Sequence, residues 1–314
     1  MGDVVHALPV LADIRRAEPR ARIDWLVEAP FAALPALHPA VSEVLPLAWR
    51  KWRKRLGERA TWAAMTALRK RLRGARYDRV LDLQGLLKSA LWARQAGAPV
   101  AGYDRTSARE PLAALFYARR AAVPRQLHAV ERCRRLAAAH LGYTLSEAAP
   151  DFGITPPVPG WGAPIDYAVL IPSASRDEKL WPEVHWVALG QRLGAQGLTP
   201  VVLWGGAAEQ QRAERIAAAC EGLVPPFLSV HDAAALLGHA RAVIGLDTGF
   251  SHLGAAFGVP TIGIYCDHEP GLAGITGPGF VRSIGGKGQP PPLDAVMALV
   301  DEQLAYSSSM RNGG

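Results

Sequence analysis

The sequence predicts an α/β protein with two doubly wound domains, each built on a mostly parallel sheet. Short apolar runs alternate with stretches of helical period along nearly the whole chain, which is typical of repeated βαβ units. The chain has 314 residues and is 49% hydrophobic, enough for two cores of ordinary size. Residues 148–164 contain five prolines and three glycines and read as a linker. We therefore expect domains at 1–150 and 151–314.

The first half is expected to open on a helix, because Val5, Leu8 and Leu11 have helical spacing. Apolar runs bounded by turn residues then predict strands, and the stretches between them predict helices. The strands are expected at 23–27, 41–47 and 79–85, and the helices at 86–95, 112–117 and 126–141, with a further helix ending near 76.

The second half repeats the alternation. Proline at the first turn supports a helix that begins near Trp181 and Pro182. The strands are expected at 167–171, 200–204, 242–246 and 261–265, and the helices at 183–193, 208–220, 232–237 and 293–304. We expect the last helix to pack back on the first domain.

Composition excludes several classes of protein. No apolar run approaches the roughly 20 residues that cross a bilayer, and the N-terminus lacks the pattern of a signal peptide. The three cysteines, Cys133, Cys220 and Cys266, are far apart and odd in number, so the sequence encodes neither a disulfide framework nor a metal knuckle. These features favour a cytoplasmic protein in a reducing compartment.

Charge is divided unevenly between the halves. Residues 1–150 hold 26 basic and 13 acidic side chains, a balance of +13, and residues 151–314 hold 9 and 15, a balance of −6. A basic half joined to an acidic half indicates that the first half meets a strongly anionic ligand. Nucleic acid, an anionic membrane surface and a charged glycolipid all satisfy this condition.

The basic surplus is densest at residues 49–76, where eleven basic residues accompany one acid, Glu58. A solvated helix face explains part of this run. Arg50, Arg53 and Lys54, however, lie close together among two tryptophans. Arginine forks and indoles suit phosphate and carboxylate groups, so we expect an anion-binding role here.

Polar residues follow several predicted strands, where ligands bind in open α/β sheets. In the first half these are Asp82, Gln84 and Lys88, and Arg109 lies in a polar loop further on. In the second half Ser175 and Lys179 follow the strand at 167–171.

The segment 242–252 is an apolar strand that stops at Asp247 and turns through Thr248 and Gly249 into a helix. Such a turn presents backbone N–H groups and the positive end of a helix dipole to an anion. The alternative is an ordinary helix cap.

Common signatures of other enzymes are absent from the sequence. Residues 285–288 lack the spacing of a P-loop, and no G-x-G-x-x-G follows a first strand. No His/Cys cluster has metal-ligand spacing, and no D-x-D pair occurs. We therefore expect chemistry that needs no metal and no cofactor.

Seven motifs, taken together, resemble those of a known family. They are MGDV at 1–4, IDWLVE at 23–28, WRKWRK at 49–54, DLQGLLKS at 82–89, TSAREP at 106–111, DEKLWP at 177–182 and DTGFSH at 247–252. In this order, over nearly the whole chain, they resemble the lipopolysaccharide heptosyltransferases, which are ADP-heptose glycosyltransferases of family 9. The cluster at 49–54 and the turn at 108–111 look most like the heptosyltransferase I branch.

The resemblance implies a GT-B fold: two Rossmann-like domains with the active site in the cleft between them. It also implies an inverting transfer of L-glycero-D-manno-heptose from ADP-heptose to the Kdo region of lipid A, at the cytoplasmic face of the inner membrane. No nucleic-acid partner is implied.

Roles follow residue by residue from the resemblance. Asp3 would be the base that deprotonates the acceptor. Lys179, with the N–H groups of Thr248 and Gly249, would neutralise the departing ADP. The donor would also contact Ser175, Glu209, Asp247 and His252, and the acceptor would contact Arg50, Arg53, Lys54, Gln84 and Arg109.

Three alternatives remain open. Heptosyltransferase II differs only on the acceptor side, and a nucleotide-sugar epimerase shares the fold but needs no basic acceptor platform. A non-enzymatic nucleic-acid binder would use the basic half alone. One feature departs from the family: an apolar strand precedes its Gly-Asp turn, whereas this sequence starts at that turn. We expect the first sheet to lack its central strand in the sequence as given.

Overall fold

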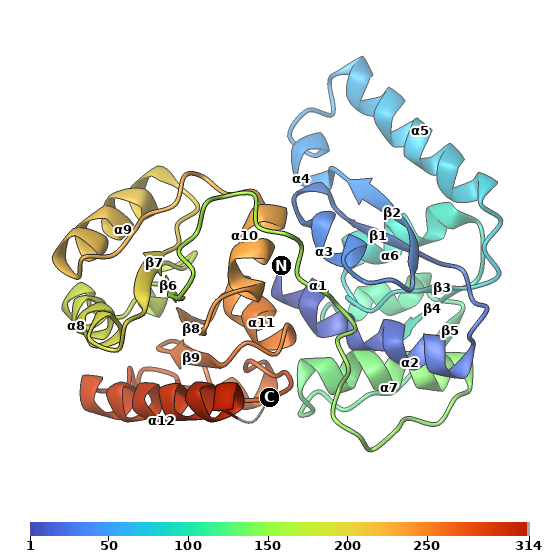
Figure 1. The fold of residues 1–314 in the computed structure, drawn as a ribbon. Helices are drawn as coiled ribbons and strands as arrows, with labels where there is room; N and C mark the ends of the chain where they lie inside the picture. Colours follow the sequence, from blue (N-terminus) through green and yellow to red (C-terminus); the bar gives the residue numbers. More distant parts are fainter. Residues whose placement is uncertain (313–314) are drawn as a thin grey trace. The chain divides into compact units, whose positions relative to one another are not determined.

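The computed structural model describes the backbone of residues 1–312 and the side chains as far as residue 307 (Figure 1). The chain divides into two compact units. The N-terminal unit is His6–Ala148, and the C-terminal unit consists of Met1–Val5 with the residues from Ala149 onward. The division falls at the edge of the Pro-rich stretch. The first five residues group with the C-terminal unit, whereas we had placed them in the first domain.

The C-terminal unit is built on a five-stranded parallel sheet with the order β10-β9-β8-β6-β7. Its strands are β6 Tyr167–Ile171, β7 Thr199–Val202, β8 Ala242–Leu246, β9 Thr261–Tyr265 and β10 Val281–Gly285, and its helices are α8 Glu183–Gly194, α9 Ala207–Ala219, α10 Val230–Gly238, α11 Gly249–Ala256 and α12 Leu293–Asn312, with short 3-10 turns η4 Asp177–Lys179 and η5 Pro270–Leu272.

Helices cover both faces of this sheet. Alternate strand residues such as Leu170, Ile244 and Ile262 form one buried cluster with side chains of α8, α9 and α12. On the other face α11 packs on β8 and β9, and the Tyr167 hydroxyl donates to the Leu236 carbonyl of α10. Continuous apolar runs in the sequence thus correspond to strands buried on both faces, as the prediction of a doubly wound sheet requires.

Helix α12 packs against β8 and β9 of its own unit. Val296 and Val300 are fully buried in the cluster beneath the sheet. The buried Gln303 amide also donates to the Pro260 carbonyl, at 2.6 Å. The helix is therefore part of the C-terminal core, and its expected packing on the first domain stays a prediction.

In the N-terminal unit, parallel strands form two sheets, β1-β2 and β3-β4-β5. The strands are β1 Ile23–Glu28, β2 Val41–Leu47, β3 Val80–Leu81, β4 Val100–Tyr103 and β5 Arg119–Ala121; the helices are α2 Pro9–Ala17, α3 Ala33–Ala36, α4 Trp49–Trp52, α5 Arg59–Gly74, α6 Leu87–Ala93 and α7 Ala129–Leu141, with 3-10 turns η1 Ala29–Phe31, η2 Arg94–Ala96 and η3 Pro111–Phe116. Helix α1, Gly2–Ala7, begins in the C-terminal unit and ends in this one.

Helices again cover both sides of the strands. Apolar side chains of α2 and α7 pack with those of β1 on one side, and α5 and α6 pack with those of β2 on the other. A buried ion pair joins α2 to α7: the Arg134 guanidinium donates to both oxygens of Asp13, at 2.7 and 3.0 Å. The Asp13 bond raises the pKa of Arg134, although burial opposes it, so the pair stays charged.

Three local predictions needed correction. The strand expected at 79–85 is only Val80–Leu81, because the chain turns at Asp82, whose carboxylate accepts from the N–H groups of Gln84 and Gly85. The helix expected at 112–117 is the 3-10 turn η3. Strand β10 lies in a Gly/Pro-rich stretch where we expected no element. It is an edge strand without strict alternation of apolar residues, so its sequence signal is weak.

Within the described residues, no helix is both long enough and apolar enough to cross a membrane.

Candidate active site

The candidate site lies at the carboxyl ends of β6, β8 and β9, which are neighbours in the C-terminal sheet. Parallel strands end at the same edge, and the loops that follow them carry the polar residues. The loop after β6 contains Lys179, the turn after β8 contains Asp247, and the loop after β9 contains Asp267 and His268. Register and topology thus collect residues that are up to 89 positions apart in the sequence.

Lys179 and Asp247 form the centre of this group. The Lys179 ammonium contacts an Asp247 carboxylate oxygen and lies 3.4 Å from the Asp247 backbone carbonyl. Both side chains are mostly buried, at 14% and 13% exposed. A pair shielded to this degree interacts more strongly than a surface ion pair.

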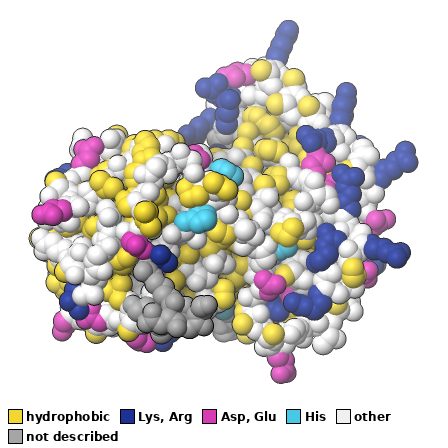
Figure 2. Space-filling model, viewed as in Figure 1, with side chains coloured by type: hydrophobic (Ala, Val, Ile, Leu, Met, Phe, Trp, Pro, Cys, Tyr) yellow, Lys and Arg dark blue, Asp and Glu magenta, His cyan; other side chains and the backbone are white. Residues whose placement is uncertain are grey.

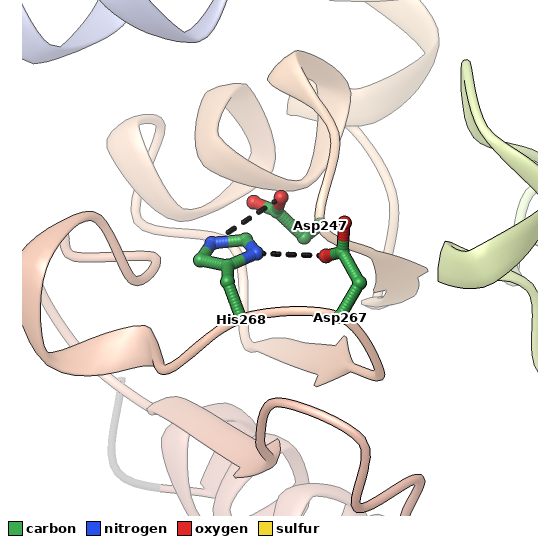
Figure 3. A group of neighbouring side chains, drawn as sticks. All are labelled: Asp247, Asp267 and His268. Carbon is green, nitrogen blue, oxygen red and sulfur yellow. Dashed lines mark hydrogen bonds and ion pairs between the residues drawn. The ribbon is translucent and has the colours of Figure 1, made fainter.

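Asp267 and His268 complete the group (Figure 3). His268 Nδ1 lies 2.9 Å from an Asp267 carboxylate oxygen, and Nε2 lies 3.5 Å from Asp247. The Arg176 guanidinium also pairs with Asp267. Sequence reasoning missed these two residues. The signal was available, because both lie within three residues of the end of a predicted buried strand, and Asp247 lies at the end of another.

The electrostatics of the group keep both carboxylates ionised. Burial raises the pKa of Asp247, but hydrogen bonds from His252 and Lys179 and the Lys179 charge outweigh it, and the pKa falls well below its usual range. Burial also opposes the shift at Asp267, where His268 and the charges of Lys179 and Arg176 lower the pKa. The site therefore offers two carboxylates as hydrogen-bond acceptors and a cation held between their loops.

The turn after β8 presents the N-terminus of α11. Thr248 is the N-cap residue, yet its side chain makes no cap hydrogen bond, and its buried Oγ1 has no partner among the described residues. Ser173 Oγ, just after neighbouring β6, is also buried, and no residue in the described part of the chain bonds to it. An ordinary capping threonine would bond to a backbone N–H. The hydroxyl and the first N–H groups of α11 are thus available to an anion.

Met1 lies against this turn within the C-terminal unit. A Cβ added at Gly249 would come within 2.5 Å of Met1 Cβ, so glycine is required for this approach. Asp3 follows in the first turn of α1 and is exposed.

The same group contains residue types that bind metal ions. Among the described residues, ligand atoms of Asp247, Asp267 and His268 all lie within 4.8 Å of one another. The Lys179 ammonium already contacts Asp247 and lies 4.0 Å from Asp267 Oδ1. A divalent ion in the same place would be repelled by this ammonium. The donor set is therefore a poor fit to a metal while Lys179 is charged.

Three other residues expected to contact the donor differ in their exposure and hydrogen bonding. Ser175 is exposed in the loop after β6. Glu209, in the first turn of α9, accepts from the Gly205 N–H at 2.8 Å, so part of its carboxylate supports the turn after β7. His252 is buried, with Nε2 3.4 Å from Asp247. That position lets it orient Asp247.

In the N-terminal unit, Gln84 and Arg109 lie in two loops that are tied together. The Glu110 N–H donates to the Gly85 carbonyl at 3.0 Å, and the Glu110 carboxylate accepts from the Leu87 N–H. Gly85 has φ +67°, and a Cβ there would lie 3.3 Å from the backbone nitrogen of Arg109. The positive φ favours glycine, and the close approach leaves little room for a Cβ.

Asp82 fixes this turn from inside. Its buried carboxylate accepts from the Ser89 and Tyr117 hydroxyls, both at 2.7 Å, in addition to the backbone bonds of the turn. Burial raises the pKa of Asp82, although these hydrogen bonds oppose the shift. Asp82 thus holds Gln84 in position and is not itself available to a ligand.

The basic cluster at 49–54 divides into exposed cations and packed indoles. Arg50, Arg53 and Lys54 are exposed, and the Arg50 guanidinium lies 5.6 Å from the centre of the Phe31 ring. Trp49 and Trp52 instead pack on Trp92, with ring centres 6.4 and 5.5 Å away. These two partly buried tryptophans anchor the segment to the core, and the expected anion-binding role of the cluster stays a prediction.

Comparison with known proteins agrees with this geometry. The model of glycosyltransferase family 9 (heptosyltransferase) matches residues 65–283. The chain is 44% identical to lipopolysaccharide heptosyltransferase 1 of Pseudomonas aeruginosa over 286 residues. This alignment covers 88% of this chain and 79% of that relative.

Solved structures extend the similarity to the whole fold. Escherichia coli heptosyltransferase WaaC with ADP is 39% identical, with a TM-score of 0.88, over 96% of this chain and 97% of that chain. The same protein with ADP-2-deoxy-2-fluoro heptose is 37% identical, with a TM-score of 0.85, over 96% of both chains.

A more distant structure shows the fold alone. E. coli ADP-heptose lipopolysaccharide heptosyltransferase II is 20% identical, with a TM-score of 0.75, over 98% of this chain and 96% of that chain. The predicted GT-B class is confirmed. The chain belongs to glycosyltransferase family 9, the heptosyltransferases, and is an enzyme that uses a nucleotide-sugar donor.

Proposed function

We propose that this protein is a heptosyltransferase I, which transfers L-glycero-D-manno-heptose from ADP-heptose to the Kdo region of lipid A. The observation that carries the proposal is the position of Lys179, whose buried ammonium lies beside Asp247 at the end of β8, next to the N-terminus of α11. A cation and a helix N-terminus together suit a diphosphate leaving group. The names of the relatives support heptose as the sugar.

The donor is assigned to the C-terminal unit. Lys179 and the N–H groups of Thr248 and Gly249 would neutralise the ADP diphosphate, and the unpartnered hydroxyl of Thr248 supplies a further donor. Ser175 is assigned to the same phosphates. Asp247 would accept from heptose hydroxyls, since its negative charge makes it a poor phosphate ligand. His252 acts through Asp247, and Glu209 is assigned to a ribose or heptose hydroxyl.

Inversion at the sugar carbon needs a base that takes the proton of the acceptor hydroxyl. We assign this role to Asp3. It is exposed in the first turn of α1, and Met1, two residues before it, lies against the donor turn at Gly249. No metal takes part in this scheme, because Lys179 supplies the positive charge that a divalent ion would otherwise bring.

The acceptor is assigned to exposed cations and an amide of the N-terminal unit. The candidates are Arg50, Arg53, Lys54, Gln84 and Arg109. Arginine binds carboxylate and phosphate in bidentate fashion, which suits the acidic sugar and the phosphates of Kdo-lipid A. This acceptor places the enzyme at an anionic membrane surface, on the cytoplasmic side of the inner membrane.

The test is release of ADP from ADP-heptose in the presence and absence of Kdo-bearing lipid A. We expect release that depends on the acceptor, and release without such dependence would overturn the proposal. An acceptor that already carries the first heptose distinguishes the two branches, because only heptosyltransferase II should use it. An epimerase would release no ADP in either case.

A further inference from the structure

One flank of helix α5 carries two arginines and an exposed tryptophan. Trp62, Thr66, Arg69 and Arg73 are spaced by four, three and four residues, which places them on one side of a helix. All four are exposed. An adjacent side of the helix buries Leu68 and Leu72 in the core. We call these four residues, with Leu56 before the helix, the α5 flank.

The apolar part of the α5 flank is not explained by packing. Trp62 is 54% exposed and Leu56 is 44% exposed. The only polar atom of the indole, Nε1, donates to the Leu56 carbonyl at 2.6 Å. Its hydrogen bond is thus satisfied locally, and the rest of the ring faces solvent. Trp49 and Trp52, by contrast, pack against Trp92.

Most of the charged side chains near this apolar pair in the sequence are positive. Lys and Arg side chains stand out from the surface where α5 is drawn (Figure 2). Within the described residues, no ion pair engages Arg69 or Arg73, while Arg71, on another side of the helix, pairs with Glu43. The nearest acid along the chain, Glu58, lies 3.8 Å from Arg55. The flank therefore offers free cations beside an exposed indole.

We propose that the α5 flank docks on an anionic lipid surface, with Trp62 and Leu56 at the level of the headgroups and Arg69 and Arg73 on lipid phosphates. Tryptophan prefers the interface of a bilayer, and each basic residue near an anionic leaflet adds to the affinity. Nucleic acid would also attract the arginines, and its bases stack on exposed indoles, but it gives no reason for the exposed aliphatic side chain of Leu56. The inference rests on the proposed function insofar as that function brings the enzyme to a membrane. It adds a contact with the bilayer itself, separate from the assigned acceptor residues.

The experiment is sedimentation of the full chain with vesicles that contain no Kdo lipid. Vesicles of equal parts phosphatidylglycerol and phosphatidylethanolamine are compared with vesicles of phosphatidylcholine. We expect binding to the anionic vesicles that falls with added salt. The double variant Arg69→Gln/Arg73→Gln should bind about 30-fold more weakly, since each cation contributes about 1 kcal/mol. Trp62→Ala should also weaken binding.

Two matched controls keep the test specific. Arg20→Gln removes an exposed arginine elsewhere in the N-terminal unit, and Phe227→Ala removes an exposed aromatic ring from the C-terminal unit. Both should bind as the unaltered protein does. The inference is overturned if the unaltered protein prefers neither vesicle, if the flank variants bind anionic vesicles as tightly as the controls, or if a short DNA duplex is bound and the vesicles are not.

A soluble acceptor separates this inference from the proposed function. With a de-acylated Kdo acceptor, the flank variants should release ADP at the unaltered rate. If the unaltered protein binds anionic vesicles but shows no acceptor-dependent release of ADP, the proposed function is wrong and the membrane-docking inference is supported. If ADP release depends on the acceptor as expected but the protein does not bind the vesicles, the membrane-docking inference is wrong and the proposed function is supported.

Discussion

The ammonium of Lys179 contacts the carboxylate of Asp247 across the ends of two neighbouring strands, β6 and β8. Both groups are largely shielded from water, and the pair lies beside the N-terminus of α11. The pair has two consequences for a diphosphate ligand. Asp247 holds Lys179 in place before the ligand arrives, and Lys179 cancels the negative charge that would otherwise repel the ligand.

Replacement of Lys179 should affect both binding and turnover. We expect Lys179→Ala to weaken ADP binding about tenfold, because a charge-assisted contact is lost. The value of kcat/KM should fall roughly 100-fold, which corresponds to about 2.7 kcal/mol of lost transition-state stabilisation, because charge on the leaving group develops in the transition state. Isothermal titration and ADP release measure the two effects. Arg282→Ala, which breaks an exposed pair with Glu302, is the control. Unchanged ADP affinity in Lys179→Ala would remove Lys179 from the phosphate site.

Replacement of Asp3 should separate chemistry from binding. Asp3→Ala is expected to abolish acceptor-dependent ADP release while ADP binding persists, because a base is needed only for the chemical step. Glu178→Ala, at an exposed acid in the loop after β6, provides a control with normal turnover. If Asp3→Ala loses ADP affinity, the residue supports the donor site and the base lies elsewhere.

Removal of divalent metal should leave the enzyme active. Transfer is expected to proceed at the same rate in excess EDTA as with added Mg²⁺, because Lys179 occupies the position beside Asp247 and Asp267 that an ion would need. Loss of activity in EDTA, with recovery on adding Mg²⁺ or Mn²⁺, would show that the carboxylates and His268 hold an ion.

The pH dependence of stability should reveal the charge on Asp247. Its pKa is lowered in the folded state, so the ionised carboxylate stabilises the fold above the unfolded pKa of about 3.9. That contribution is lost as pH falls through the lower folded pKa. In urea unfolding, the free-energy difference between the unaltered protein and Asp247→Asn should be constant from about pH 7 to pH 5 and shrink below about pH 4.

Asp82 should give stability the opposite dependence on pH. Burial raises its pKa, so ionisation costs stability in the folded state. The difference between the unaltered protein and Asp82→Asn should therefore fall as pH rises from about 4 through the raised pKa. The same slope at both aspartates would contradict the two assignments.

The buried pair Asp13–Arg134 should be important for the stability of the N-terminal unit. Arg134→Met leaves the Asp13 carboxylate buried without its partner, and we expect a loss of about 3 to 5 kcal/mol in the free energy of unfolding. The double variant Asp13→Leu/Arg134→Met should recover most of this loss. Arg192→Met, which breaks an exposed pair with Asp301, should cost about 1 kcal/mol or less. Equal effects of Arg134→Met and Arg192→Met would refute the difference attributed to burial.

The sequence was sufficient for the class of the fold and for the place of the candidate site. Apolar runs such as Ala242–Leu246 are readable because a strand buried on both faces must be continuously hydrophobic. The residues that follow such runs are readable as site candidates because parallel strands end at one edge, and Asp247 and Lys179 were found in this way. Asp267 followed the same rule and was overlooked.

The tertiary structure decided what each polar or aromatic residue does. Composition at 49–54 could not distinguish Trp52, packed on Trp92, from Trp62, which is exposed, because packing depends on distant residues. The sequence also could not reveal that the Asp82 carboxylate accepts internal hydrogen bonds, or that Lys179 contacts Asp247. The local pattern of the chain determined its strands, helices and candidate residues. Burial and pairing are properties of contacts between remote segments, and only the folded chain fixes them.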